Sequence, residues 1–334
     1  MAAPRSVLIV GGTAGLGFHT TLRIAKEHPG LLVVIAARSS NNDVAGRINK
    51  SLGQTNVKYM PLDLADLDNV RDFARKWVTE KLPPIKALLL NAGGQYTGPL
   101  EKAPSGIEKT FAINHVGNAF VFFLLLPQLA DNSRIVLTSS GTHDPEQETG
   151  GFPKPIFTTA QDAAYVPPAA ATAGSSLRYY STAKLCNVLF MYALHRRLQE
   201  RKSSVAVTVM DPGLMPGTEL ARTRPKVVQW LWKHVMPHML PVLRLLSGSS
   251  NIHTVAHSAD NLARLALGPE FEGVSGKYFE GNTEIKSSKD SYDVAKQEDL
   301  WGWTVRFLTT GDATQEAQWR ELRVLPAGVG GGFV

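Results

Sequence analysis

The segment "VLIVGGTAGLG", residues 7–17, decides the fold that we predict for this chain. An apolar run typical of a buried strand leads directly into a helix-length segment, with glycines at the junction. Glycine there lets a pyrophosphate reach the helix N-terminus, where free N–H groups and the helix dipole favour an anion. The alternative is a turn that only packs tightly. We predict a dinucleotide site that includes Gly11, Thr13, Ala14, Gly15, Leu16 and Gly17.

The rest of the chain alternates between short apolar runs and helix-length segments. This alternation predicts βαβ units, and therefore a Rossmann-type, doubly wound α/β fold: a parallel sheet with helices on both faces. In such sheets, ligands bind beyond the carboxyl ends of the strands. The predicted strands are 6–12, 31–38, 57–64, 86–93, 133–140, 205–213 and 276–281, and the predicted helices are 15–28, 66–80, 105–129, 181–202 and 252–267.

The composition of the 334-residue chain is that of a globular protein, with 43% apolar and 19% charged residues. No linker-like tract or internal repeat divides it, so we expect one domain over 1–334, with an insertion at 141–178 and a substrate lid at 214–250. The single cysteine, Cys186, excludes an intramolecular disulfide, and the N-terminus lacks the apolar core of a signal peptide. We therefore expect a cytoplasmic protein, without a transmembrane helix.

The net charge of +6 comes from scattered basic residues. They do not form a basic stripe interleaved with aromatic residues, so we expect a solvated surface and no nucleic-acid partner. His253 and His257 are four residues apart, but no carboxylate or cysteine at fitting spacing completes a metal site. We expect no bound metal.

The end of the second predicted strand, "AARSS", indicates which dinucleotide binds. A carboxylate there would bind the ribose 2′-hydroxyl of NAD, whereas Arg38, with Ser39 beside it, suits the 2′-phosphate of NADP(H). The alternative is a surface arginine. Asp63 either accepts a hydrogen bond from the adenine amino group or caps the helix that follows. The small residues of "NAGG" let the backbone run close to the adenosine, although the asparagine could be purely structural. Further predicted cofactor contacts are Leu64, Asn91, Ala92 and Gly93.

The segment "YYSTAK", residues 179–184, carries the candidate proton donor. Tyr180 and Lys184 share a helical face because they are four residues apart. The ammonium and a positive nicotinamide would lower the pKa of the phenol from about 10, making it a general acid or base. Ser140, at the end of "LTSS", can present its hydroxyl to the same oxygen. Asn114 either binds a water on a path to Lys184 or is a satisfied core amide or a helix kink.

Together these motifs resemble the short-chain dehydrogenase/reductase superfamily. The matching elements are the glycine turn, Asp63, "NAG" at 91–93, Asn114, Ser140, Tyr180-x-x-x-Lys184 and "PG" at 212–213. The resemblance implies that Tyr180, Lys184 and Ser140 are catalytic and that Asn114 serves a proton relay. It also implies that Lys184 hydrogen-bonds the nicotinamide ribose and that Thr218 binds the nicotinamide amide. Pro212, Gly213, Asn114, Tyr180 and Lys184 complete the expected cofactor contacts. Val10 and Leu90 depart from the usual threonine and asparagine.

Within the superfamily, the chain is most similar to light-dependent protochlorophyllide reductases. The likeness rests on "THDPEQETGGFPKP" at 142–155 and "KLCNVLFMYALHRRL" at 184–198. Leu214 stands where that group has a cysteine, and Ser140 where it has a threonine. These departures favour a related reductase that works in the dark.

The expected function is therefore an NADP(H)-dependent oxidoreductase. It would transfer a hydride between nicotinamide and the carbonyl or alcohol of a bulky, largely apolar small molecule. One alternative is a non-catalytic NADP(H)-sensing protein, and another is a protochlorophyllide reductase-type enzyme that reduces a C=C bond. Trp230, Trp232, Met236 and Met239 are expected to line the lid. Core packing is the alternative for them, membrane contact is not expected, and a homodimer or homotetramer is a candidate assembly.

Overall fold

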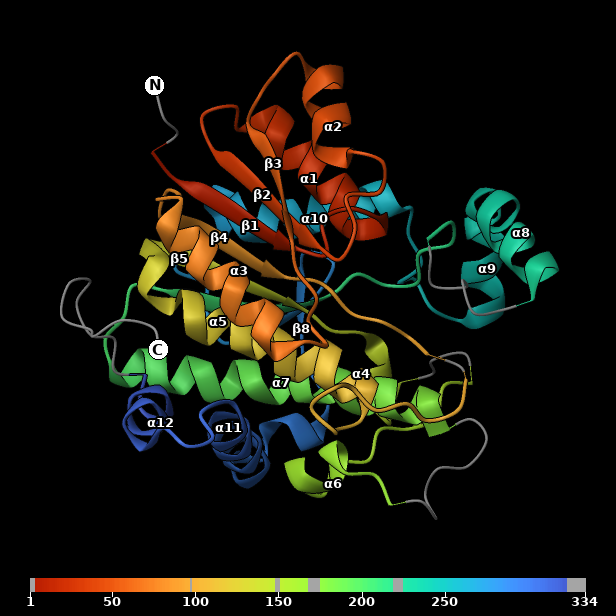
Figure 1. The fold of residues 1–334 in the computed structure, drawn as a ribbon. Coiled ribbons are helices and arrows are strands. Elements are labelled where there is room, and N and C mark those ends of the chain that lie inside the picture. Colours follow the sequence, from red (N-terminus) through yellow and green to blue (C-terminus); the bar gives the residue numbers. More distant parts are fainter. Residues whose placement is uncertain (1–3, 97, 148–150, 168–174, 219–224, 323–334) are drawn as a thin grey trace.

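The centre of the fold is one eight-stranded sheet, in the order β3-β2-β1-β4-β5-β6-β7-β8 (Figure 1). The computed structural model describes residues 4–96, 98–147, 151–167, 175–218 and 225–322. Strands β1 to β7 pair in parallel, and β8 is antiparallel to β7. The strands are β1 Ser6–Val10, β2 Leu32–Ala37, β3 Val57–Pro61, β4 Ile85–Leu90, β5 Leu129–Thr138, β6 Ala206–Asp211, β7 Lys277–Glu280 and β8 Thr283–Ile285.

The central strands are apolar on both faces because helices cover both faces. Every residue of β1 is buried, as is every residue of β6. The chain moves from β1 outward through β2 to β3, and then returns to the other side of β1 with β4. This reversal leaves a crevice beyond the carboxyl ends of β1 and β4, which is where an open α/β sheet binds its ligand.

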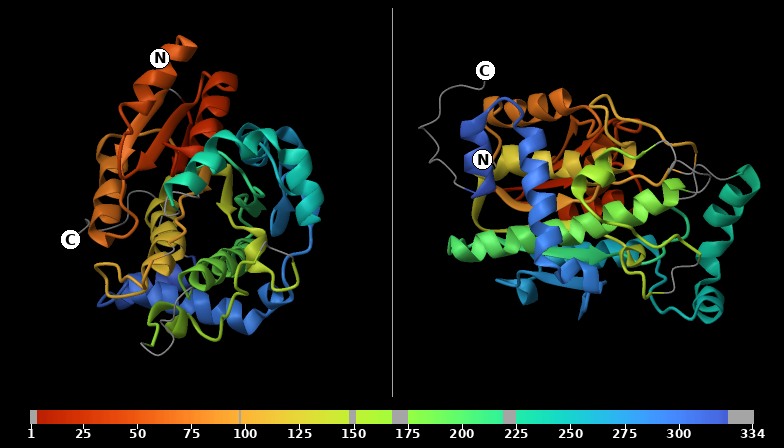
Figure 2. Two further views of the ribbon diagram at one scale, coloured as in Figure 1. Left: turned by 90° about the vertical axis from the view of Figure 1, so that its right-hand side faces the viewer. Right: turned by 90° about the horizontal axis from the view of Figure 1, so that it is seen from below.

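Two layers of helices cover the sheet (Figures 1 and 2). One layer holds α1, α2 and α10, which bury residues such as Ile24, Ile48 and Leu262 against it. The other holds α3, α5 and α7, with α11 and α12 packed outside α7. The helices are α1 Gly15–Glu27, α2 Val44–Leu52, α3 Leu67–Thr79, α4 Lys109–Phe111, α5 Asn118–Leu125, α6 Ala160–Ala164, α7 Ser175–Glu200, α8 Lys226–His234, α9 Leu240–Ser247, α10 Val255–Leu267, α11 Val294–Leu308 and α12 Ala313–Arg320.

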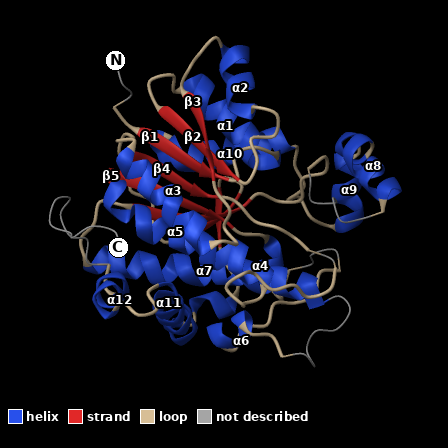
Figure 3. Cartoon of the chain, viewed as in Figure 1, coloured by secondary structure: helices blue, strands red, loops and turns tan. Residues whose placement is uncertain are grey.

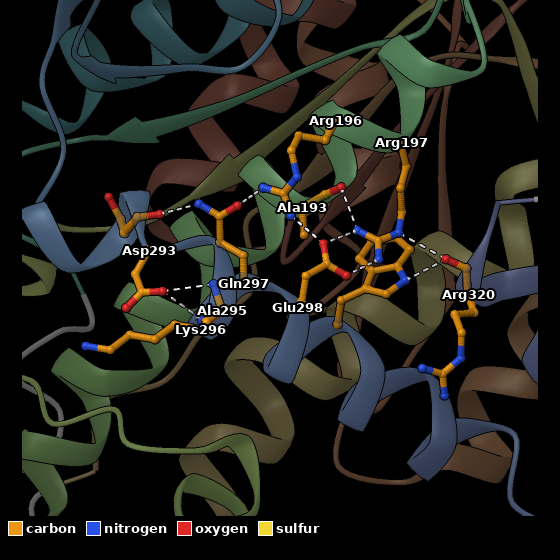
Figure 4. A network of polar contacts seen from close by, with 11 residues as sticks. Ala193, Arg196, Arg197, Asp293, Ala295, Lys296, Gln297, Glu298 and Arg320 are labelled. Carbon is orange, nitrogen blue, oxygen red and sulfur yellow. Dashed lines mark hydrogen bonds and ion pairs between the residues drawn. The ribbon is translucent and has the colours of Figure 1, made fainter.

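A polar network fixes the outer helices against α7 (Figure 4). Arg197 pairs with Glu298 of α11 at 2.6 Å between Nη2 and Oε2. Its Nε donates to the Arg320 carbonyl of α12 at 3.0 Å, and its guanidinium lies 4.3 Å from the ring centroid of Trp301. Arg196 reaches the same carboxylate. Because α7 also carries Tyr180, these contacts support the element that positions the candidate site.

The six predicted strands from β1 to β6 and the parallel sheet are confirmed, and β7 matches the predicted late strand. The sequence prediction omitted α2, β8, α11 and α12. It also placed the start of the long helix at 181, whereas α7 begins at Ser175, inside the predicted insertion. The predicted helix 105–129 is broken: a π-helical turn, Ala112–Gly117, separates α4 from α5.

This broken helix is the most apolar helical run of the described residues. By length and composition, Lys109–Gln128 could cross a membrane, contrary to the expectation from the sequence. However, 83% of its apolar window is buried inside the fold. Its apolar residues, including Phe120 and Phe123, therefore pack in the core beneath the sheet.

Candidate active site

A cavity of about 620 Å³ opens at the carboxyl ends of β1 to β4. Thirteen of the predicted cofactor contacts line it: Gly11, Thr13, Ala14, Gly15, Leu16, Arg38, Ser39, Asp63, Leu64, Asn91, Ala92, Gly93 and Thr218. The lining also includes Val10, Ala36, Ala37, Asn41, Leu62, Gly94, Gln95, Tyr96, Ile113 and Met215, which the sequence analysis did not select. Most of the lining residues lie at the carboxyl ends of β1 to β4 or directly after them.

The glycine turn has the shape that an anion needs. Gly11 and Gly15 adopt left-handed φ values of 83° and 50°. A Cβ on Gly17 would lie 2.1 Å from the Gly11 carbonyl oxygen, so only glycine lets α1 begin this close to β1. The N-cap of α1, Ala14, makes no side-chain hydrogen bond to the first turn, and that turn contains no acid. Its N–H groups are therefore positioned to bind a phosphate.

Arg38 lies at the rim of the cavity with an exposed side chain. Beside it, Asn41 donates from Nδ2 to the Thr13 carbonyl and hydroxyl, at 3.2 Å each. Asn41, Asn42 and Asp43 all have positive φ, between 45° and 58°. This strained turn brings the end of β2, with Arg38, against the glycine turn, and a contact between Arg38 and a 2′-phosphate stays a prediction.

The contacts of Asp63 show whether it caps the helix that follows. Asp66, not Asp63, caps α3: it accepts from the N–H groups of Asp68 and Asn69. Asp63 instead accepts from the N–H of Ala65 at 3.0 Å and faces the cavity. The helix-cap interpretation of Asp63 is therefore wrong, and a contact with adenine stays a prediction.

Asn91 ties three strand ends together. Its Nδ2 lies 3.3 Å from the Gly11 carbonyl oxygen, and Thr138 donates to its Oδ1 at 3.4 Å. The side chain is thus a structural link between β1, β4 and β5 that also borders the cavity.

Tyr180, Lys184 and Ser140 meet beside the cavity. The Nζ of Lys184 lies 5.5 Å from the Tyr180 ring centroid, and the phenol is hydrogen-bonded to Ser140. Lys184 is buried, and its Nζ donates to the Thr138 carbonyl at 2.9 Å. A Cβ on Gly93 would lie 3.3 Å from that Nζ. Because Gly93 lines the cavity, the lysine reaches the cofactor site directly beneath it.

Burial shifts the pKa values of both groups in opposite directions. It raises the pKa of Tyr180 to about 12, although the hydrogen bond with Ser140 opposes the shift, and it lowers the pKa of Lys184 to about 8. The sequence analysis expected a lowered phenol pKa. Without the cofactor the shift is in the other direction, because desolvation of the phenolate is the largest effect, and the effect of a bound nicotinamide stays a prediction. Tyr180 is therefore held protonated in this structure.

Asn114 lies in the π-helical turn, on the same side of Gly93 as Lys184. Its Oδ1 accepts from the N–H of Gly94 at 2.7 Å, and its Nδ2 donates to the Gly94 carbonyl at 3.0 Å. These bonds make it a satisfied core amide at a helix irregularity, the second of the two interpretations of the sequence. Its Oδ1 would also lie 3.3 Å from a Cβ on Gly93. The proton relay through Asn114 stays a prediction.

Asp211, at the end of β6, is a site residue that the sequence analysis missed. It is buried, and it accepts from the N–H of Gly213 at 2.9 Å and from Asn251 Nδ2 at 2.8 Å. Burial raises its pKa to about 6, and its charge raises the pKa values of both Tyr180 and Lys184. An acid directly before "PG" at a strand end was the available signal.

The "PG" turn at 212–213 is fixed in place by contacts with Ser258 and Asn251. Ser258 donates to the Pro212 carbonyl at 2.7 Å. Gly213 has a φ of +75°, and a Cβ there would lie 2.2 Å from Asn251 Oδ1. Thr218 follows at the cavity wall, where its side chain faces Gly15 at 3.9 Å from the position of a Cβ. Pro212 and Gly213 themselves stand outside the cavity lining.

The predicted lid differs from the structure. Within 214–250, only Met215 and Thr218 of the described residues line the cavity. Trp230 is 58% exposed, and helices α8 and α9 stand apart from the body (Figure 2). Figure 3 shows the strands pointing toward the side on which α8 and α9 lie. Trp232 is half-buried, with its Nε1 donating to the Thr218 carbonyl at 3.0 Å. The side chains of Trp230, Trp232, Met236 and Met239 lie outside the cavity wall in this structure, and their role as a lid stays a prediction.

No metal site interrupts this picture. Among the described residues, no group of three histidine, cysteine or acidic side chains could hold an ion. The rings of His253, in the turn before α10, and His257, on α10, have centroids 4.8 Å apart and are tilted by 40° to each other.

A glycine turn on a Rossmann-type sheet, with a tyrosine, lysine and serine gathered beside it, defines a dinucleotide-dependent oxidoreductase. Residues 5–150 match the family model for short chain dehydrogenases, and residues 220–317 match the AcuH dehydrogenase domain. Polyprenol dehydrogenase of Danio rerio is 30% identical, over 88% of this chain and 83% of its own length. The chain belongs to the short-chain dehydrogenase/reductase family.

Two further proteins illustrate the likeness. Polyprenol dehydrogenase of Homo sapiens is 29% identical, over 93% of this chain and 87% of its own length. A short chain dehydrogenase from Burkholderia cenocepacia J2315, solved in complex with NADP, has a TM-score of 0.58 at 22% identity. It covers 83% of this chain and 96% of its own. At that identity, the structural likeness concerns the fold.

Proposed function

We propose that this protein is an NADP(H)-dependent oxidoreductase that interconverts a carbonyl and an alcohol on a bulky, largely apolar substrate. The observation that carries the proposal is the position of Lys184, whose Nζ lies next to Gly93 of the cavity wall and 5.5 Å from the Tyr180 ring centroid. A protein that only senses the nucleotide would not require a protonated phenol beside a buried lysine. The cofactor, when bound, supplies the hydride.

The residues of the chain supply the proton and the geometry. In the reducing direction, Tyr180 donates its proton to the substrate oxygen as that oxygen gains negative charge. Ser140, hydrogen-bonded to the phenol, orients the same oxygen. The Lys184 ammonium, held by the Thr138 carbonyl, stabilises the phenolate that the transfer leaves behind. The charge of Asp211 favours the protonated forms of Tyr180 and Lys184, so that the phenol keeps the proton it donates.

Arg38 supports the choice of NADP(H). Its guanidinium lies at the rim of the cavity, at the end of β2, where the adenosine ribose of a dinucleotide would lie. The fixed fork of a guanidinium suits a phosphate and gains nothing from a free 2′-hydroxyl. The solved neighbour from Burkholderia cenocepacia was obtained with NADP, which agrees with this choice.

The apolar character of the substrate has two supports. Met215 and Ile113 line the cavity together with Tyr96, so its far wall offers apolar and adaptable contacts. The similar proteins from Homo sapiens and Danio rerio are named for a polyprenol, an alcohol with a long apolar chain. We place the substrate of this chain in the same chemical class of long apolar alcohols and their carbonyl products.

A substrate panel with the purified chain tests the proposal. NADPH oxidation is followed with isoprenoid aldehydes, bulky ketones and small polar carbonyls, and NADP⁺ reduction with the matching alcohols. We expect kcat/KM to rise with the apolar area of the substrate and to be unchanged by light. Binding of NADPH without turnover on any member of the panel would favour a sensing protein instead. Preference for small polar substrates would contradict the substrate class, and light-dependent reduction of a C=C bond would contradict the reaction.

A further inference from the structure

The α8–α9 arm, residues 225–250, presents most of the large apolar side chains that this structure exposes. Of the fourteen exposed large hydrophobic residues among those described, eight lie in the arm: Val227, Val228, Trp230, Leu231, Met239, Val242, Leu245 and Leu246. No residue of α8 is buried. Exposed apolar residues concentrated in one segment in this way indicate an interaction site, since large apolar side chains are otherwise buried by folding.

The exposed residues follow helical spacing on both helices. Val227, Trp230 and Leu231 stand at i, i+3 and i+4 in α8, and Val242, Leu245 and Leu246 repeat the pattern in α9. Leu245 and Leu246 are 83% and 78% exposed. Each helix therefore has an apolar stripe that faces away from the protein, as an interfacial helix does.

The charge of the segment identifies the kind of partner. From 220 to 259 the sequence contains no aspartate or glutamate, although the whole chain has 29 acidic residues. The same segment contains five lysines and arginines: Arg222, Arg224, Lys226, Lys233 and Arg244. Lys226 and Lys233 are exposed on α8. A protein surface would need acidic residues to match these cations, whereas an anionic lipid surface matches both the charge and the apolar stripes.

Polar contacts hold the arm beside the mouth of the cavity. The Trp232 indole donates to the carbonyl of Thr218, a cavity residue, at 3.0 Å. At the other end of the arm, Arg244 donates from Nε and Nη2 to the Ile252 carbonyl at 2.9 and 2.6 Å. These contacts tie both helices of the arm to the body, although the helices themselves stand clear of it (Figures 1 and 2).

We propose that the α8–α9 arm docks this protein onto an anionic membrane surface, with Trp230, Leu245 and Leu246 entering the apolar boundary. Lys226 and Lys233 lie at headgroup level, where each cation near an anionic surface adds to binding. Tryptophan is the aromatic residue most suited to that interface. Docking by the arm would bring the cavity mouth to the membrane. The supply of an apolar substrate from the bilayer rests on the proposed function, but the docking itself does not.

Vesicle co-sedimentation of the full chain tests the docking. Phosphatidylcholine vesicles with and without phosphatidylserine are compared for the natural protein and for the double variant Leu245→Glu with Leu246→Glu. We expect binding to the phosphatidylserine vesicles that rises as ionic strength falls, and a loss of about tenfold or more in the variant. The control is Val294→Glu, which makes one such substitution at an exposed apolar position of α11 and should bind like the natural protein.

A second readout separates docking from folding and from turnover. The emission of Trp230 should shift to shorter wavelength on phosphatidylserine vesicles, and the shift should be absent in Trp230→Phe. Reduction of a short, water-soluble carbonyl in solution should be the same for the double variant, which shows that it folds. Failure of the natural protein to bind the vesicles would overturn the proposal, as would equal binding by the double variant. Self-association that Leu245→Glu with Leu246→Glu abolishes, without vesicle binding, would assign the arm to a second copy instead and overturn it too.

Discussion

The cofactor cavity and the α8–α9 arm lie at the same edge of the sheet, yet their apolar residues are placed in opposite ways. Val10 and Leu62, which line the cavity, are 1% and 2% exposed. Leu245 and Leu246 of the arm are 83% and 78% exposed. The apolar residues of the cavity are thus buried by the fold, whereas no described residues cover the apolar stripes of the arm.

This difference shows at which positions contacts within the fold determine the residue type. A side chain on Gly17 would meet the Gly11 carbonyl oxygen at 2.1 Å, and one on Gly93 would crowd Lys184. Those positions therefore follow from the close approach of backbone segments. On the arm, polar residues in place of Leu245 or Leu246 would be compatible with the same helix. Apolar residues there point to a partner outside the chain.

The largest effect is expected beside the cavity, from Tyr180→Phe. This change removes only the proton donor, so kcat should fall by about 10²–10⁴-fold while NADPH affinity is retained. Steady-state kinetics and NADPH fluorescence titration measure the two quantities. Tyr179→Phe is the matched control, since that ring belongs to another face of α7. Equal losses in the two variants would refute the role of the Tyr180 phenol.

A smaller effect is expected at the rim of the cavity, from Arg38→Gln. Hydrogen bonds between charged groups contribute about 1.5–3 kcal/mol, so the KM for NADPH should rise about tenfold to hundredfold. The KM for NADH should change little, because NADH lacks the 2′-phosphate. Arg75→Gln, which removes an equally exposed charge from α3, should change neither value. Equal use of both cofactors by the natural protein would contradict the assignment of Arg38.

The sequence predicts the cavity better than it predicts the arm, for a physical reason. The strand order and the glycine turn follow from apolar runs and from positions where only glycine fits, such as Gly17. Tyr180 and Lys184 were found because helical spacing brings them to one face. Asp211 was missed because its role arises from Gly213, Asn251 and the catalytic pair, which only the fold brings together.

The arm shows the opposite case. The same tryptophans and methionines could form a lid, a core or a membrane contact, since all three need apolar residues at helical spacing. Only exposure distinguishes them, and exposure depends on tertiary packing. The missed helix α2 has a related cause: it follows three residues with positive φ, Asn41, Asn42 and Asp43, a turn that has no strong sequence signal.

The pH dependence of stability sharpens the comparison, because Lys184, beside the cavity, carries a buried charge that destabilises the fold. Burial lowers the pKa of Lys184 from 10.5 to about 8, so the free energy of unfolding should rise as pH increases between these values. The shift corresponds to about 3 kcal/mol, and the lost hydrogen bond to Thr138 offsets about 1 kcal/mol. Lys184→Met should therefore be more stable by about 2 kcal/mol near neutral pH, although inactive.

Denaturant unfolding near neutral pH and at about pH 10 measures this difference. The advantage of Lys184→Met should shrink at the higher pH, because the natural lysine then loses its proton in the folded state. Lys50→Met on α2 is the control, an exposed lysine whose removal should leave stability unchanged at both pH values. A Lys184→Met protein that is less stable at every pH would show that the ammonium stabilises the fold.

The smallest effect is expected on the arm, and it tests the comparison most directly. Leu245→Ala should change the free energy of unfolding by no more than about 0.5 kcal/mol, because a side chain that is 83% exposed gives up little burial. Leu189→Ala, the same substitution at a fully buried position of α7, should cost about 2–5 kcal/mol. Urea unfolding of both variants without vesicles compares them on one scale. If Leu245→Ala cost as much as Leu189→Ala, the arm would be packed against the body in solution, and its stripe could not face a membrane. A near-zero cost, together with loss of vesicle binding, would show that this leucine contributes to docking and not to folding.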